Sequence, residues 1–168
     1  MNKPQWIIVH HEAPPVTTNS PRFGVVNEYH KLKGFPKSSL GYFCGYHLFI
    51  EKSGLVWKAR EDFDIGAHTI GYNDKSLGVC LAGNFDIEMP TEAQKTALRS
   101  VLKEKTIQYG ILPLNIVPHR KFSQKTCYGS KLPDTWAADL LTKEEKISVL
   151  QSVLNSLWKT LQALMGKR

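Results

Sequence analysis

Residues 6–11 read Trp6-Ile7-Ile8-Val9-His10-His11, an apolar run rich in β-forming residues that ends in two histidines. A short apolar run of this kind predicts a buried strand. Because successive side chains of a strand point to opposite faces, only one of the two histidines can normally enter a given site. Strand geometry alone leaves open which one does.

The rest of the chain alternates predicted strands and helices around this segment. Apolar runs predict further strands over 42–50, 55–58, 77–81 and 115–117, with a hairpin turn at 51–54. Helical spacing of apolar residues predicts helices over 23–32, 91–109, 135–141 and 142–165, the second opened by a Thr-x-x-Gln capping box. These elements predict an α/β fold, a mixed central β-sheet flanked by helices, with an added C-terminal amphipathic helix.

Composition and charge narrow the class of protein. The 168 residues suffice for one compact domain, and 42% apolar with 22% charged residues is typical of a soluble globular protein. The net charge of +7 attracts polyanions, which include nucleic acids, anionic membranes and acidic cell-wall polymers. No run of five or more Lys or Arg occurs, so we expect no nucleic-acid partner.

The first residues and the cysteines bear on the compartment. Residues 1–9 lack the apolar stretch of a secretory signal, and no segment reaches the ~18 apolar residues of a membrane span. The chain as given is therefore expected to be cytoplasmic as synthesised, or to leave by a route not written in these residues. An odd number of cysteines, three, argues against a disulfide framework. Cys44 and Cys80 lie in apolar runs and are predicted to be buried thiols.

Three features together indicate a metal site: the His10-His11 pair, His119 after a short strand, and Cys127 eight residues later. Eight residues of helix rise ~12 Å, too far for two ligands of one ion. Residues 118–129 lack a helical pattern, however, so a loop could bring His119 and Cys127 together. Two His and one Cys leave the fourth zinc position open, as in catalytic sites. From spacing alone, the simpler interpretation is unrelated histidines and an inert thiol.

Other catalytic signatures are missing from the sequence. His11-Glu12 does not open a His-Glu-x-x-His helix, because Pro14 and Pro15 follow. There is also no Gly-x-Ser-x-Gly turn, no Gly-x-x-x-x-Gly-Lys-Ser/Thr loop and no Gly-x-Gly-x-x-Gly. Enzymes that depend on these motifs are therefore not indicated.

The sequence contains five motifs in a fixed order: Ile8-Val9-His10-His11-Glu12-Ala13, Gly45-Tyr46-His47-Leu48-Phe49-Ile50, Gly66-Ala67-His68-Thr69 with Gly71-Tyr72-Asn73, Ser76-Leu77-Gly78-Val79-Cys80-Leu81-Ala82-Gly83, and His119-Arg120 with Lys125-Thr126-Cys127. This order resembles the N-acetylmuramoyl-L-alanine amidases, a family that includes amidase-type phage lysozymes and the peptidoglycan recognition proteins. The resemblance covers roughly residues 6–141. The five motifs together are far more specific than any one alone.

The resemblance implies a ligand set. The family's metal ligands are the His that follows the first strand, a late His, and a Cys eight residues after it. It therefore implies one Zn²⁺ per chain, held by His10, His119 and Cys127, and resolves the ambiguity between His10 and His11. The family usually has proline directly after the ligand cysteine, whereas this chain has Tyr128, which we expect in the wall of the cleft.

The resemblance also implies roles for five other residues. Tyr46 and Lys125 match catalytic helpers, Lys125 to stabilise the oxyanion and Tyr46 to orient the attacking water or pass on its proton. His68, Asn73 and Ser76 fall where the family lines its substrate groove. From the residues alone, Tyr46 is an ordinary strand aromatic, Lys125 a solvated charge, and the other three form turns.

These implications predict a peptidoglycan hydrolase that cleaves the amide bond between N-acetylmuramic acid and L-alanine with zinc-activated water. The catalytic domain is predicted over residues 1–141, and the expected role is that of a phage-type endolysin that acts on the cell wall after release. An intracellular amidase that recycles wall fragments and a non-catalytic peptidoglycan-binding module are the alternatives. The complete ligand set favours an enzyme, whereas the missing secretion signal fits both recycling and an endolysin.

Residues 142–168 lie beyond the resemblance and are predicted as a separate amphipathic helix. Apolar residues recur every three or four positions from Ile147 to Met165 and form one stripe. Packing of this stripe on the enzyme's own surface is the simplest interpretation. Basic charge and Trp158 also suit contact with an anionic membrane, and helix–helix self-association is a third alternative.

Overall fold

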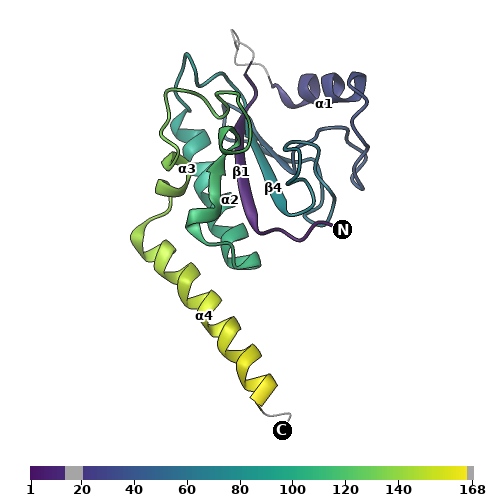
Figure 1. The fold of residues 1–168 in the computed structure, drawn as a ribbon. Helices are drawn as coiled ribbons and strands as arrows, with labels where there is room; N and C mark the ends of the chain where they lie inside the picture. Colours follow the sequence, from purple (N-terminus) through teal and green to yellow (C-terminus); the bar gives the residue numbers. More distant parts are fainter. Residues whose placement is uncertain (14–20, 166–168) are drawn as a thin grey trace.

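The computed structural model describes residues 1–13 and 21–165, and a five-stranded sheet lies at its centre (Figure 1). The strands are β1 (Trp6–His11), β2 (Leu48–Ile50), β3 (Val56–Lys58), β4 (Ser76–Leu81) and β5 (Ile116–Pro118). The helices are α1 (Phe23–Leu32), α2 (Glu92–Tyr109), α3 (Trp136–Asp139) and α4 (Lys143–Met165), with 3-10 turns η1 (Pro113–Asn115) and η2 (His119–Lys121).

The sheet is mixed, which confirms the predicted α/β class. Its strand order is β3-β2-β4-β1-β5; β2 and β3 pair antiparallel, and the other neighbours pair in parallel. As predicted, β1 is buried: residues 7–9 are fully inaccessible, with β4 on one side and β5 on the other. Since the carboxyl ends of parallel strands meet at one edge of a sheet, the residues at the ends of β1 and β5 lie close together there.

Helices cover both faces of the sheet. On one face the inward side chains pack with α2 and α3, and on the other they pack with α1. Cys44 and Cys80 belong to the second of these cores, and both thiols are buried and free, which confirms the prediction. The capping box at the start of α2 is also present, since Thr91 and Gln94 each accept a hydrogen bond from the other's backbone N–H.

The predicted strand over 42–50 is wrong in its first two thirds, because only its last three residues form β2. The backbone N–H groups of residues 43–45 donate to the side chains of Asn27 and His30 on α1, at 2.7–3.0 Å. These side chains satisfy donors that a neighbouring strand would otherwise accept. The segment therefore runs as irregular chain, and it carries Tyr46 to within 5.0 Å of His10, measured between ring centroids.

Two carboxylates hold α1 beside the end of β1. The predicted loop before α1 includes residues 14–20, which lie outside the described residues. At the start of α1, Glu51 accepts hydrogen bonds from the backbone N–H groups of Arg22 and Phe23, both at 2.8 Å. A carboxylate at this position accepts hydrogen bonds from the free N–H groups at the start of a helix. Its negative charge also interacts favourably with the positive end of the helix dipole. The Arg22 guanidinium in turn pairs with Glu12 at 2.6 Å.

The C-terminal helix α4 is attached to the body through its first turns. Glu145 pairs with Arg99 of α2 at 3.1 Å, and Val149 is buried against the body. From Leu154 to the last described residue every side chain is exposed, and Figure 1 shows α4 projecting away from the sheet. The prediction that the whole stripe packs on the protein's own surface is therefore wrong beyond the first turns. Among the described helices, none combines the length and apolar character needed to cross a membrane. Residues 166–168 of the predicted tail lie outside the described residues.

Candidate metal centre

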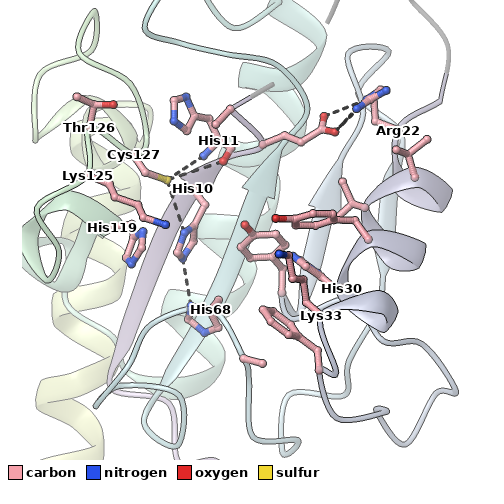
Figure 2. Close-up of a pocket in the computed structure, with 18 of the residues that line it drawn as sticks. His10, His11, Arg22, His30, Lys33, His68, His119, Lys125, Thr126 and Cys127 are labelled. Carbon is pink, nitrogen blue, oxygen red and sulfur yellow. Dashed lines mark hydrogen bonds and ion pairs between the residues drawn. The ribbon is translucent and has the colours of Figure 1, made fainter. Parts of the chain in front are cut away.

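Three side chains, one from near the start of the chain and two from residues 119–127, meet at the carboxyl edge of the sheet. His10 is near the end of β1, His119 follows β5 directly, and Cys127 returns to them at the end of a loop. One ligand atom from each lies within 4.8 Å of the other two. The Cys127 Sγ atom is 3.7 Å from His10 Nδ1, and the ring centroids of His10 and His119 are 4.5 Å apart. Figure 2 shows the three side chains pointing toward one another.

The spacing of these atoms fits a zinc ion. Ligands bound tetrahedrally at zinc distances of about 2.0–2.3 Å lie about 3.3–3.8 Å from one another. The observed 3.7 Å between Sγ and Nδ1 falls within that range. His10 and Cys127 are buried and His119 is half-buried, and all three line one cleft, which leaves space for a fourth ligand on that side. Two His and one Cys with an open position is the donor set of a catalytic zinc site.

Burial keeps the three groups uncharged when no cation is near. The pKa of His10 lies well below its ordinary value, chiefly because of burial and then because of His68. Burial also lowers the pKa of His119, followed by the charge of Lys125. Both imidazoles are therefore in the neutral form that binds metal. Burial raises the pKa of the Cys127 thiol to about 12, so the thiolate requires a compensating positive charge such as a divalent cation.

The second histidine of the pair faces elsewhere. His11 Nδ1 accepts a hydrogen bond from the backbone N–H of Phe85 at 3.0 Å, and in Figure 2 its ring points away from the cluster. Its backbone N–H donates to Cys127 Sγ at 3.4 Å. The alternation expected for a strand thus separates His10 from His11, and His10 is the one that joins the cluster.

The loop that carries Cys127 is tied down by Arg120. The Arg120 guanidinium donates to the carbonyl oxygens of Gly129 and Leu132, both at 2.6 Å, and pairs with Asp134. Arg120 stands beside His119 in the fifth motif, but the sequence alone does not indicate this role. Tyr128, expected in the wall of the cleft, is instead fully buried in the core, so that expectation is wrong. Its hydroxyl donates to backbone carbonyl oxygens of the same loop.

His68 contacts His10 directly. His10 Nε2 and His68 Nδ1 share a hydrogen bond of 3.1 Å, which leaves His10 Nδ1 for the cluster (Figure 2). The His68 ring is held between two glycines, since a Cβ at Gly66 or Gly78 would lie only 2.5–2.6 Å from it. A partner on the outer nitrogen of a metal-binding histidine fixes its orientation and tautomer. His68 also lines the cleft.

Asn73 and Ser76 lie behind His68 rather than in the cleft. The Asn73 side chain accepts hydrogen bonds from the backbone N–H groups of His68 and Thr69, both at 2.8 Å, and so holds their turn. Ser76 is fully buried, donates to the Tyr72 carbonyl at 2.7 Å, and lies 3.4 Å from His68 Nε2. Neither is among the residues that line the cleft. Both are thus in position to support His68.

Tyr46 and Lys125 border the same cleft, whose volume is about 1060 Å³. Tyr46 is half-buried, and burial, followed by nearby thiols, raises its pKa well above the ordinary value, so its hydroxyl stays protonated. Lys125 is exposed, and in Figure 2 its amino group lies beside His119. The opposite wall is formed by α1, and Arg22 and Lys33, which flank its two ends, also border the cleft.

Comparison with known sequences places the chain among the amidases and endolysins that the motifs resemble. The family profile described as N-acetylmuramoyl-L-alanine amidase matches residues 1–130. The endolysin of Klebsiella phage KP32 is 32% identical over 146 residues, which cover 83% of this chain and 89% of that protein. The endolysin of Escherichia phage T7 is 31% identical over 147 residues, covering 83% and 90%.

Solved structures extend the comparison to three dimensions. The N-acetylmuramoyl-L-alanine amidase LysC from Clostridium intestinale URNW superposes with a TM-score of 0.66 at 27% identity, covering 79% of this chain and 80% of that one. Drosophila PGRP-LB superposes with a TM-score of 0.65 at 24% identity, covering 78% of each chain, and this likeness concerns the fold.

Proposed function

The chain belongs to the N-acetylmuramoyl-L-alanine amidase family of peptidoglycan hydrolases, and on this premise we propose that it hydrolyses its amide bond with one zinc ion bound by His10, His119 and Cys127. The bond is the one that joins N-acetylmuramic acid to the L-alanine of the stem peptide. The observation that carries the proposal is the approach of three donor atoms to within 4.8 Å of one another beside a cleft. A complete ligand set also favours an enzyme over a non-catalytic binding module.

The cluster suits this ion for a chemical reason. A zinc ion held there supplies a Lewis acid for the amide carbonyl and lowers the pKa of a bound water to about 7. The protein's own part is to present two neutral imidazoles and a thiol at fixed positions. His68 orients His10 through their 3.1 Å hydrogen bond, and Arg120 holds the loop that carries Cys127.

Lys125 and Tyr46 act on the reacting groups from two sides. When the lactyl carbonyl is attacked, negative charge develops on its oxygen, and the Lys125 ammonium at the cleft mouth stabilises that charge. The Tyr46 hydroxyl remains protonated because burial raises its pKa, so it serves as a hydrogen-bond donor that orients water or substrate in the cleft.

The three residues expected in the substrate groove, His68, Asn73 and Ser76, have different proposed roles. His68 lines the cleft, which supports contact with the muramyl peptide in addition to its bond to His10. Asn73 and Ser76 contribute through the turn and the buried hydroxyl that hold His68 in place. We therefore propose that they support the groove from behind rather than touch the substrate.

The biological role proposed here is that of an endolysin that acts on the cell wall after release. Similarity that runs along most of the length of two phage endolysins supports this role. An amidase that recycles wall fragments would instead prefer small soluble substrates, so substrate size separates the two roles.

The test is a digestion of purified sacculi and, in parallel, of soluble muropeptides. Cleavage of the amide releases free amino groups and no new reducing ends, and we expect turnover on sacculi. New reducing ends would mean that a glycosidic bond is cut, and the proposed chemistry would be wrong. Activity confined to soluble muropeptides would favour the recycling role.

A further inference from the structure

Helix α4 carries a regular row of exposed aliphatic side chains. The row, called here the α4 seam, consists of Ile147, Leu150, Leu154, Leu157, Leu161 and Leu164. The intervals alternate between three and four residues, which is the a/d spacing of a coiled coil over three heptads. These six side chains are 43–65% exposed. A seam of this regularity left in solvent indicates a surface that is covered in the working protein.

The seam faces away from the catalytic body. The body is contacted by Glu145 and Val149, with Val153 half-buried, and these residues occupy heptad positions f, c and g. The seam occupies a and d, on another side of the helix. In Figure 1 the outer part of α4 stands clear of the sheet and of the other helices. A second long helix can therefore approach the seam without displacing the contacts that attach α4.

The charges around the seam favour another α4 as the occupant. Between Ile147 and Met165 the only charged residue is Lys159, which falls at position f, the position most remote from the seam. The flanking e and g positions from 151 to 165 hold Gln, Trp, Met, Val and Thr, so two copies can pair without bringing like charges together. Anionic membranes bind amphipathic helices that carry several Lys or Arg along the polar face. One lysine in this stretch gives little attraction of that kind.

We propose that α4 is a self-association element, in which the seam of one chain packs against the same seam of a second copy. From residue 147 to residue 164 the seam is about 27 Å long, enough for a paired-helix interface. Trp158 and Met165 at position e widen the apolar face, as in helices that pack in bundles. The pair is two-fold symmetric, so each seam residue both gives and receives the contact.

A dimer formed through α4 would contain two catalytic clefts. If the proposed function holds, both clefts can engage one polymeric substrate, and the second engagement then takes place at a high effective concentration. The pairing itself does not depend on the proposed function, because neither the seam nor its contacts include a residue of the metal centre.

Sedimentation equilibrium of the full chain across micromolar concentrations tests the proposal. The wild type should associate to a dimer. Leu154→Glu and Leu157→Glu should each weaken association by at least about 30-fold, as expected for a central interface residue that is lost from both partners. The matched control is Asn155→Glu, which adds the same charge to the same exposed stretch but on the polar face, and it should associate like the wild type.

Circular dichroism and zinc content verify that each variant remains folded, since all three positions are exposed. A wild type that stays monomeric over the whole range overturns the proposal, as does a Leu154→Glu variant that associates like the wild type or an Asn155→Glu variant that dissociates. The same samples are mixed with vesicles that contain phosphatidylglycerol. Vesicle binding by a monomeric wild type, abolished by Leu154→Glu, would assign the seam to lipid and reject self-association.

Discussion

Replacing His68 by alanine should weaken zinc binding while leaving all three ligands in place. The structure gives His10 two nitrogen partners: Nδ1 faces the cluster, 3.7 Å from Cys127 Sγ, and Nε2 is bonded to His68 at 3.1 Å. Without the second partner the His10 ring can rotate and change tautomer. Loss of such an outer partner typically weakens metal binding by about 10–100-fold, which corresponds to about 1.4–2.7 kcal/mol.

The assay is competition for zinc against a chromophoric chelator, which reports the zinc Kd without any substrate. His68→Asn is the matched variant, because an asparagine amide can offer a hydrogen-bonding group near the position of His68 Nδ1. We expect its zinc Kd to lie between those of the wild type and His68→Ala. An unchanged Kd for a folded His68→Ala variant would refute the assignment of His68 as the positioning partner of His10.

Three further predictions concern the catalytic side chains, the buried histidines and the outer part of α4. Lys125→Ala should lower amine release from peptidoglycan by about 10²–10³-fold at normal zinc content, and Tyr46→Phe should also lower it; undiminished turnover in both would remove them from the mechanism. Burial lowers the pKa values of His30 and His47 from 6.5 to about 4. As the pH falls, these histidines bind protons at a higher pH in the unfolded chain than in the folded one. The free energy of unfolding of the metal-free protein should therefore fall as the pH drops from 6.5 toward 4, which denaturant midpoints with excess chelator would measure. A free energy of unfolding that does not change over this pH range would mean that the two rings bind protons in the folded state as readily as in the unfolded chain. At concentrations where the full chain is monomeric, truncation after Val153 should leave the melting temperature unchanged, since the described residues beyond it are exposed; a lower value would reveal packing against the body.

The meeting of His10, His119 and Cys127 could be predicted from motifs but not from spacing. In the sequence, 116 residues lie between His10 and Cys127. The two meet because β1 and β5 are parallel neighbours whose carboxyl ends share an edge, and the loop that follows β5 carries Cys127 back to that edge. Strand alternation correctly required that one of His10 and His11 point elsewhere. Which one joins the cluster depends on the register of β1 in the sheet, and no local pattern in the sequence encodes that register.

The surroundings of the centre were harder to predict because loop side chains can turn either way. Asn73 and Ser76 have the polar character of groove residues, yet backbone N–H groups and a carbonyl bind them from behind. Tyr128 was expected at the cleft but is buried in the core. The role of Arg120 could not be predicted, because it binds carbonyl oxygens of a loop whose path depends on the tertiary structure. In each case the deciding contact is with backbone that periodicity and composition do not position.

The most direct test of the central claim is metal analysis combined with amine release for Cys127→Ala and Cys80→Ala. Both cysteines are buried and free, so the pair controls for the loss of a buried thiol. We predict one zinc per chain in the wild type and in Cys80→Ala, with amino groups released from peptidoglycan by both. Cys127→Ala should lose the zinc and the activity together. A Cys127→Ala protein that keeps stoichiometric zinc and full turnover would contradict the proposed centre.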